Sequence, residues 1–438
     1  MEPITIGIII SVALVLVLGS GIPVAFGLGI VSVVSLLLWE GPNAISGIAE
    51  TFYSGLAEFT LVSIPMFIVM GAVVASSPAG KDLYTALDRW LNKVPGGLIL
   101  SNLGACSIFA ALSGSSPATC AAIGKMGIPE MRKRGVEDGL ATGSIAAGGT
   151  LGILIPPSIT MIVYGVATET SIGRLFLAGL VPGFMLTMLF MVWSLYSAWK
   201  RDPEFMSKAQ TYSWKERLNV LPRVLPFIAI IIGVLYVLYG GVATPSEAAG
   251  VGALLCLLVA VAIYKLFSFK KIWTILSDSM KESVMILMII GASALFSYTL
   301  SSLFVTQTVA ETIATLDVNR WVLLGCINLF LLVAGMFLPP VAVILMTAPI
   351  LMPIITAAGF DPYWFAVILT INMEIGLITP PVGLNLYVIN GIVPDVNLTT
   401  VLKGAFPFVV CMVVAIVILC IFPELATWLP DQVMGAAQ

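Results

Sequence analysis

The sequence contains no histidine, and this absence removes several classes of active site. Zinc enzymes with His ligands need the imidazole ring, and so do hydrolases that pair a Ser or Cys nucleophile with His. The six cysteines lie in apolar stretches and form no Cys-x-x-Cys pair, so we expect small buried hydrophobic residues rather than metal ligands. We therefore predict that the protein is not an enzyme.

Charge is also scarce. Only 10% of the residues are charged, against about 25% in a soluble domain, and 59% are hydrophobic. Apolar runs of about 20 residues, the length that crosses a bilayer core, follow one another along the chain. These features predict an all-α polytopic membrane protein in a lipid bilayer. The first 30 residues carry no basic flank, which indicates a first span rather than a cleaved signal peptide, and no basic tract suggests a nucleic acid partner.

Five Gly and Pro positions occur twice in the chain, each pair separated by 224 residues. Pro and Gly interrupt helices, and a broken helix in a bilayer leaves backbone groups that other atoms must satisfy. Breaks at matching positions of two halves indicate the binding site of a transporter. The two sets are Pro129, Gly135, Gly152, Pro156 and Pro157, and Pro353, Gly359, Gly376, Pro380 and Pro381.

The spacing of spans and breaks predicts two inverted repeats, each with a re-entrant helical hairpin and a discontinuous transmembrane helix. The first repeat covers 1–199, a cytoplasmic linker covers 200–223, and the second repeat covers 224–438. In the first repeat we expect scaffold helices in 1–76, an arm helix in 78–94, hairpin one in 97–130 and a broken helix in 138–169. In the second we expect scaffold helices in 224–302, an arm in 303–319, hairpin two in 320–357, a broken helix in 362–391 and a last span in 403–427.

The basic residues orient the predicted helices. If each hairpin enters and leaves the membrane on the same side, all Lys and Arg residues except Lys125, Arg174 and Arg320 fall on one side of the membrane. Ordinary spans through both hairpins are the alternative, and they would place Ser113 and Pro339 in aqueous loops. With the positive side in the cytoplasm, both termini are predicted to be periplasmic.

Hairpin tips within a bilayer offer free carbonyl and hydroxyl oxygens, which are ligands for a hard cation. At the first tip Ser113, Ser115 and Ser116 face the break at 148–157, and this predicts one Na⁺ site. The repeat predicts a second between 335–340 and 376–381, with Thr379 as its hydroxyl. The alternative is that Gly and Ser only allow helices to pack closely.

An organic anion would need the positive ends of half-helices, and segments that start at Pro117, Pro157 and Pro381 provide them. Two charged residues lie within apolar segments, and each has two possible roles. Lys125 either serves function or extends to the cytoplasmic face, and Glu374 is either a coupling acid or a structural hydrogen-bond acceptor. The candidate substrate residues are Ser116, Thr119, Ser158, Thr160, Asn372 and Asn385.

Six stretches of the chain resemble the large membrane subunit of tripartite ATP-independent periplasmic (TRAP) transporters, and they cover both halves. They are SIPMFIVMG (63–71), ALSGSSPAT (111–119), GGTLGILIPPS (148–158), YGVATETSIGRLF (164–176), YGGVATPSEAA (239–249) and GLITPPVGLN (376–385).

The resemblance implies an elevator-type transporter of the ion-transporter superfamily kind in the bacterial inner membrane. Uptake of a carboxylate, such as a C4-dicarboxylate or sialic acid, would be driven by about two or more Na⁺ ions. A separate small four-helix membrane subunit and a periplasmic substrate-binding protein are the implied partners. The implied Na⁺ ligands are Ser113, Ser115, Gly152, Ile155 and Pro157 at site 1, and Gly335, Phe337, Gly376, Thr379 and Pro381 at site 2.

Three other functions compete with this interpretation. A stand-alone Na⁺/divalent-anion symporter shares the paired hairpins but needs no binding protein. An intramembrane protease would need His or paired Asp residues inside the membrane. A passive channel would lack saturable, Na⁺-coupled uptake.

Overall fold

The computed structural model describes residues 2–91, 93–94, 96–201, 212–265, 268–315 and 318–435. Throughout these ranges the regular elements are helices, and no strand occurs among them. Among the described residues, seven helices are long and apolar enough to cross a membrane, or up to nine if each of two bent helix pairs counts as one span. The chain is therefore an all-α, multi-pass membrane protein, as predicted.

One group of helices forms a body that we call the scaffold. Within it α4 packs on α13 and α14, and α14 packs on α2 and α3. The motif Thr244–Glu247 begins α13 with a reciprocal cap, in which each side chain accepts from the backbone N–H of the other residue. The scaffold consists of α1 (Pro3–Gly19), α2 (Val24–Trp39), η1 (Pro42–Gly47), α3 (Ile48–Leu56), η2 (Phe59–Val62), α4 (Ser63–Ala75), α12 (Leu221–Tyr239), α13 (Pro245–Tyr264) and α14 (Phe269–Ser302).

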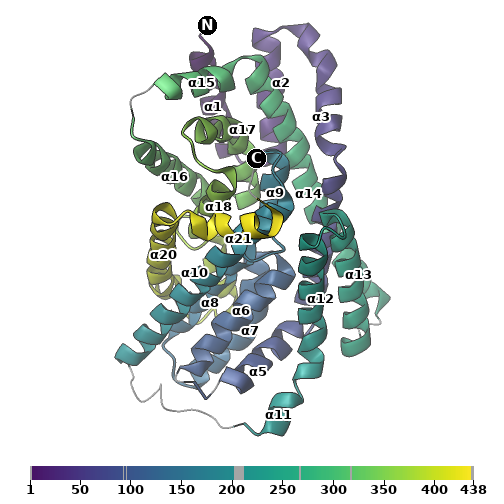
Figure 1. The fold of residues 1–438 in the computed structure, drawn as a ribbon, viewed down its shortest axis with the longest axis vertical. Coiled ribbons are helices and arrows are strands. Elements are labelled where there is room, and N and C mark those ends of the chain that lie inside the picture. Colours follow the sequence, from purple (N-terminus) through teal and green to yellow (C-terminus); the bar gives the residue numbers. More distant parts are fainter. Residues whose placement is uncertain are drawn as a thin grey trace.

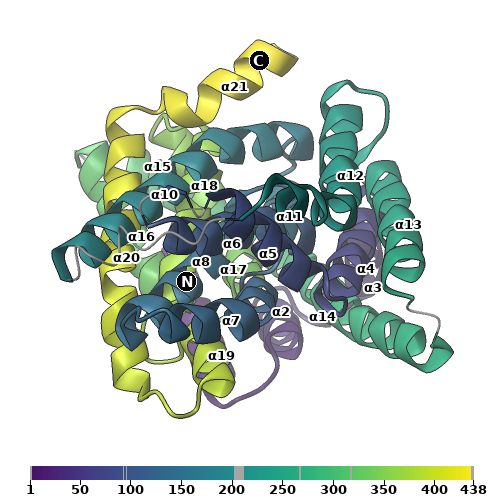
Figure 2. The ribbon, with the colours of Figure 1, turned by 90° about the horizontal axis from the view of Figure 1, so that it is seen from below.

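The remaining long helices form a second body, the hairpin unit, which stands beside the scaffold in Figure 2. Its two helix-turn-helix pairs are α6–α7 and α16–α17, and its two broken helices are α8–α9 and α18–α19. The hairpin unit consists of α6 (Gly97–Ser113), α7 (Ser116–Lys133), α8 (Asp138–Leu154), α9 (Ile159–Ala167), α10 (Ile172–Arg201), α16 (Arg320–Phe337), α17 (Pro340–Ala357), α18 (Pro362–Leu377), α19 (Leu384–Ile392), α20 (Leu398–Ile421) and α21 (Glu424–Met434).

The repeated Gly and Pro residues occupy equivalent places in the two halves. Gly135 and Gly359 both follow a hairpin with positive φ, at 88° and 72°, a conformation that glycine adopts without steric cost. Both Pro-Pro peptide bonds, at 156–157 and 380–381, are cis and lie in the breaks. The sequence repeat is thus a structural repeat.

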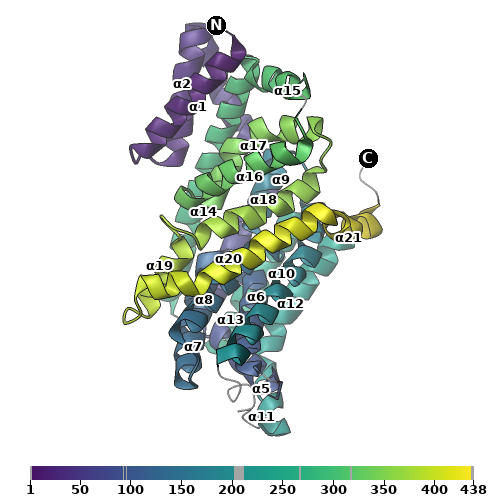
Figure 3. The same ribbon diagram turned by 90° about the vertical axis from the view of Figure 1, so that its left-hand side faces the viewer.

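The two repeats are inverted relative to each other. The arm helices α5 (Ala79–Leu91) and α15 (Val305–Thr315) lie at opposite ends of the molecule in Figures 1 and 3. The α6–α7 hairpin occupies the half nearer α5, and the α16–α17 hairpin occupies the half nearer α15. The hairpins therefore approach the middle of the molecule from opposite ends.

Ion pairs join three elements at the α5 end. Arg134, at the base of hairpin one, contacts Asp88 of α5 at 3.0 Å, and Arg223 of α12 lies 3.7 Å from Asp82. Arg89 of α5 donates to the carbonyl of Glu216 in α11 (Trp214–Leu218) at 2.8 Å. Basic residues that the sequence assigns to the cytoplasm thus share one end of the molecule with this arm.

Several helix boundaries differ from the predictions. The predicted last span at 403–427 is α20, which begins at Leu398 and ends before Pro423, where α21 starts in a new direction (Figure 2). The predicted linker at 200–223 contains α11 and the start of α12, and its residues 202–211 lie outside the described ranges.

A close helix contact in the hairpin unit joins α8 and α20 through glycines. A Cβ atom added at Gly404 would lie 1.9 Å from the carbonyl oxygen of Gly139, and one added at Gly143 would lie 2.2 Å from the carbonyl carbon of Gly404. Small residues let two helix backbones approach this closely within a membrane.

Replacing Gly404 with Ala is therefore expected to destabilise the protein by about 1–3 kcal/mol, because the added methyl group meets backbone that cannot rotate away. Thermal unfolding in detergent measures the change. Gly250→Ala in α13 is the matched control, since nothing lies within 4 Å of its Cβ position. An unfolding temperature equal to that of Gly250→Ala would contradict the close contact.

Candidate functional site

The tip of hairpin one gathers oxygen atoms at the turn between α6 and α7. The Ser113 and Thr119 hydroxyl oxygens lie 2.9 Å apart, and the Thr119 hydroxyl donates to the Ser115 carbonyl at 2.9 Å. Gly114 turns the chain with φ of +58°. These neutral oxygens suit a hard monovalent cation.

The first broken helix closes over this tip. A Cβ atom at Gly152 would lie 3.4 Å from the Ser115 carbonyl oxygen, and one at Gly114 would lie 3.2 Å from the Pro157 carbonyl oxygen. Ile155 ends α8, between these two positions. The structure therefore brings the tip of hairpin one and the first break together at predicted Na⁺ site 1. The hydroxyl and carbonyl oxygens predicted as ligands lie close to one another there.

Predicted Na⁺ site 2 has the same backbone arrangement but fewer side-chain oxygens. A Cβ atom at Gly376 would lie 2.4 Å from the Gly335 carbonyl oxygen, so the second break also touches its hairpin. The Thr379 hydroxyl, just beyond the end of α18, donates to the Ile375 carbonyl in the last turn of that helix. Phe337 and Pro381 are exposed, and Phe337 contributes no side-chain oxygen. Site 2 would therefore bind a cation mainly through backbone carbonyls.

A side-chain contact links the two halves of the site. The Ser116 hydroxyl, at the start of α7, lies 2.8 Å from both carboxyl oxygens of Glu374 in α18. Glu374 is fully buried. The structure thus shows Glu374 as a hydrogen-bond acceptor that holds the first hairpin to the second broken helix. Lys125, by contrast, is exposed on α7.

Both hairpin tips open into one cavity of about 450 Å³. Residues 114–117 of the first tip and 339–342 of the second line it, together with residues of α14 and the start of α2. Hairpins that enter from opposite ends and meet at their tips cannot each cross the full thickness of the molecule. This geometry favours re-entrant hairpins over ordinary spans.

The predicted substrate residues divide into two groups. Ser116 and Thr160 line the cavity between the tips. The other four make hydrogen bonds that hold the surrounding structure. Thr119 bonds within the first tip, and Ser158 caps α9 by accepting from the Met161 N–H at 3.2 Å. Asn372 donates to the Asn328 carbonyl at 2.7 Å, and Asn385 donates to the Ala146 carbonyl at 3.2 Å.

Glu282 is a lining residue that the sequence does not identify. It lies in α14 and is the only charged residue that lines the tip cavity in the described part of the chain. From the sequence, Glu282 marks the polar start of a span, since it follows Lys281 and precedes an apolar run. The sequence offers no signal that brings Glu282 beside the hairpin tips, because its place in the cavity wall depends on tertiary packing.

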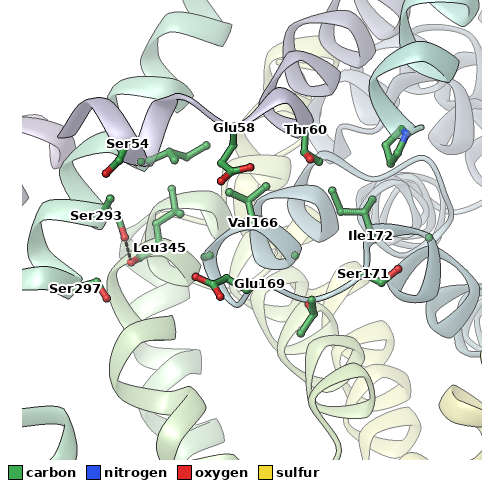
Figure 4. A pocket seen from close by; sticks show the side chains of 18 of the residues that line it. Ser54, Glu58, Thr60, Val166, Glu169, Ser171, Ile172, Ser293, Ser297 and Leu345 are labelled. Carbon is green, nitrogen blue, oxygen red and sulfur yellow. Dashed lines mark hydrogen bonds between the residues drawn. The ribbon is translucent and has the colours of Figure 1, made fainter. Parts of the chain in front are cut away.

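A larger cavity, of about 920 Å³, lies farther along α14 (Figure 4). The carboxyl groups of Glu58 and Glu169 point into it, and Ser293 donates to the Leu345 carbonyl at its edge. It lies between scaffold helices α3 and α14 and the hairpin-unit helices α9, α10 and α17. The two cavities are thus neighbouring gaps along one interface.

Comparison with known proteins connects this architecture to one family. The model of the family described as "Tripartite ATP-independent periplasmic transporter, DctM component" matches residues 9–425. The C4-dicarboxylate TRAP transporter large permease protein DctM of Pseudomonas aeruginosa is 36% identical over 92% of this chain and 93% of its own length. Its counterpart in Vibrio cholerae is 34% identical, with 97% and 98% covered.

Relatives with other named substrates are similar to this chain too. The ectoine TRAP transporter large permease protein TeaC of Halomonas elongata is 30% identical over 94% of this chain and 96% of its own length. Among solved structures, the Neisseria gonorrhoeae MtrF efflux pump superposes with a TM-score of 0.64 at 15% identity, covering 88% of this chain and 85% of its own. That likeness concerns the fold.

Proposed function

Since this chain belongs to the DctM family of tripartite ATP-independent periplasmic transporters, we propose that it is the large permease subunit of a Na⁺-driven importer of a small organic acid anion. The main support is the single cavity in which both hairpin tips meet. C4-dicarboxylates, sialic acid and related carboxylates are the candidate substrates. It is a membrane transport subunit and not an enzyme.

The donor atoms around the cavity support coupling to cations. Oxygens of Ser113, Ser115 and Thr119 lie together at the first tip, and Gly335 and Gly376 bring a second set of carbonyls close. Two bound Na⁺ ions would hold the tips against the breaks and supply positive charge beside the cavity. The N-termini of α7 and α17 point to the same place, where their dipoles favour an anion.

The course of α14 supports an elevator movement. Residues between 282 and 289 line the tip cavity, and residues between 290 and 297 line the larger cavity. Equivalent positions such as Met285 and Ser293 lie eight residues apart, or about 12 Å along a helix axis. We propose that the hairpin unit slides along α14 by about this distance while the scaffold stays still.

Position in the cell and partners follow from the family. We propose an inner-membrane location with the α5 end in the cytoplasm and both termini in the periplasm. A separate small membrane subunit would pack on the scaffold, and a periplasmic binding protein would deliver the substrate. Reconstitution tests this directly: uptake into proteoliposomes should require Na⁺ and all three proteins. Uptake by the large subunit alone would instead indicate a stand-alone symporter.

Removing one hydroxyl from each predicted cation site should weaken Na⁺ coupling. We expect Ser113→Ala and Thr379→Val each to raise the Na⁺ concentration for half-maximal uptake by about fivefold, the effect of losing one ligand worth about 1 kcal/mol. The measurement is initial uptake as a function of Na⁺ concentration.

Two matched controls remove hydroxyls from the same helices away from the tips. Ser101 bonds the Gly97 carbonyl in α6, and Thr370 bonds the Ala366 carbonyl in α18. Ser101→Ala and Thr370→Val should leave the Na⁺ dependence unchanged. If both test variants matched their controls, the two cation sites would be wrongly placed.

A further inference from the structure

We propose that Glu282 is a release residue, which repels the bound anion when the hairpin tips lie opposite the first part of α14. The inference rests on the proposed function, because it assigns a role within that transport cycle. It concerns the cytoplasmic side, since Lys270, Lys271 and Lys281 place this end of α14 there.

Glu282 belongs to the α14 wall of the tip cavity. The same wall contains Met285, Ile286 and Ile289, one helical turn and two turns farther on. All other lining residues in the described chain are uncharged, and most are apolar. An ion in this cavity would therefore meet one charged lining side chain, and it is acidic, while the buried Glu374 carboxyl lies behind Ser116.

No described cation neutralises Glu282. Its neighbour Lys281 lies within 2.9 Å of Asp278, one turn back along α14, and this exposed pair lies outside the cavity. Neither Lys nor Arg occurs among the described lining residues. Glu282 itself is exposed, and its side chain lines the cavity.

The opposite wall attracts anions. The first turn of α7 begins at Ser116 without a side-chain cap, and α17 begins at Pro340, also without one. A carboxylate held there would share the cavity with Glu282. Two like charges about 8 Å apart repel by about 1–2 kcal/mol at an effective dielectric constant of 20 to 40, which corresponds to about five- to thirtyfold in affinity.

The proposed movement confines this repulsion to one state. Because Glu282 lies on the scaffold, a shift of the tips by about 12 Å toward residues 290–297 would take the anion away from it. Glu282 would then weaken binding after delivery and have little effect on capture.

The local potential can be measured without knowing the substrate. With Cys326, Cys411 and Cys420 replaced by Ser, Met285→Cys places a thiol in the cavity, and its rates of reaction with cationic and anionic methanethiosulfonates are compared. We expect the anionic reagent to be disfavoured, and Glu282→Gln to reduce that preference by about fivefold. Asp278→Asn, which removes the same charge outside the cavity, should have little effect. Equal preferences with and without Glu282 would overturn the proposal.

The release step is tested in proteoliposomes that hold the complete transporter, with succinate, N-acetylneuraminate and isethionate as probes. For any probe that is taken up, the probe is also loaded inside the vesicles, and the lumenal probe concentration that halves net uptake is measured. This concentration should fall about fivefold in Glu282→Gln, because the variant binds the lumenal anion more tightly, and it should stay unchanged in Asp278→Asn. An unchanged or higher concentration in Glu282→Gln would mean that Glu282 does not repel the anion, or that it holds it. If no probe and no other carboxylate were taken up, the proposed function would fail, while the thiol experiment would still decide the charge effect.

Discussion

Replacing Gly376 with Ala is expected to reduce Na⁺-driven uptake at least about tenfold while the protein remains folded. The added Cβ atom would lie 2.4 Å from the carbonyl oxygen of Gly335, 2.5 Å from its carbonyl carbon and 3.1 Å from its Cα atom. These atoms belong to the backbone, so no change of rotamer can relieve the overlap. The break and the tip of hairpin two must separate, and both residues are predicted ligands of Na⁺ site 2.

The measurement combines uptake with thermal unfolding in the presence and absence of Na⁺. In the wild-type protein Na⁺ should raise the unfolding temperature, because a ligand that binds only the folded state stabilises it. In Gly376→Ala we expect this shift to shrink. Gly391→Ala in the adjoining α19 is the control, since its Cβ position is open within 4 Å. Normal uptake by Gly376→Ala would show that tip and break need not touch.

The sequence predicts the hairpins and breaks well because their causes are local. Pro156, Pro157 and the matching Pro380 and Pro381 cannot donate a backbone hydrogen bond, and α8 and α18 end just before these pairs. The single prolines Pro129 and Pro353 of the same repeat, by contrast, lie inside α7 and α17. Gly135 adopts a positive φ that few other residues tolerate. Such residues set the chain direction by themselves, and repetition at one offset strengthens the prediction.

Contacts between distant residues could not be predicted in this way. Ser116 and Glu374 are 258 residues apart, and their hydrogen bond exists only because hairpin one and α18 pack together. Hydrophobic patterning also hides Glu282, since a charged residue at the edge of an apolar run is typical of a span that ends in water. The cavity walls depend on tertiary packing, and composition carries no signal for it.

Replacing Gly71 with Ala is expected to reduce turnover about tenfold by disfavouring the arrangement in which hairpin one rests on the scaffold. A Cβ atom at Gly71 in α4 would lie 2.4 Å from the Ser113 carbonyl oxygen and 3.0 Å from the Ser113 carbonyl carbon. Gly71 and Ser113 belong to different bodies, so the hairpin unit can escape the overlap by moving. An overlap worth about 1–3 kcal/mol would shift a two-state equilibrium by about five- to 150-fold.

Distances between spin labels on the two bodies can distinguish this shift from simple damage. Exposed Tyr236 on α12 and exposed Val410 on α20 are suitable labelling positions, with Cys326, Cys411 and Cys420 replaced by Ser. We expect Gly71→Ala to populate a second distance at the expense of the one in this structure, whereas Gly233→Ala, with open space around its Cβ position in α12, should not. The contact joins a scaffold glycine to a predicted Na⁺ ligand, so a sliding movement must break it. If Gly71→Ala showed an unchanged distance distribution and normal uptake, a sliding movement in which Gly71 supports the first hairpin tip would be ruled out.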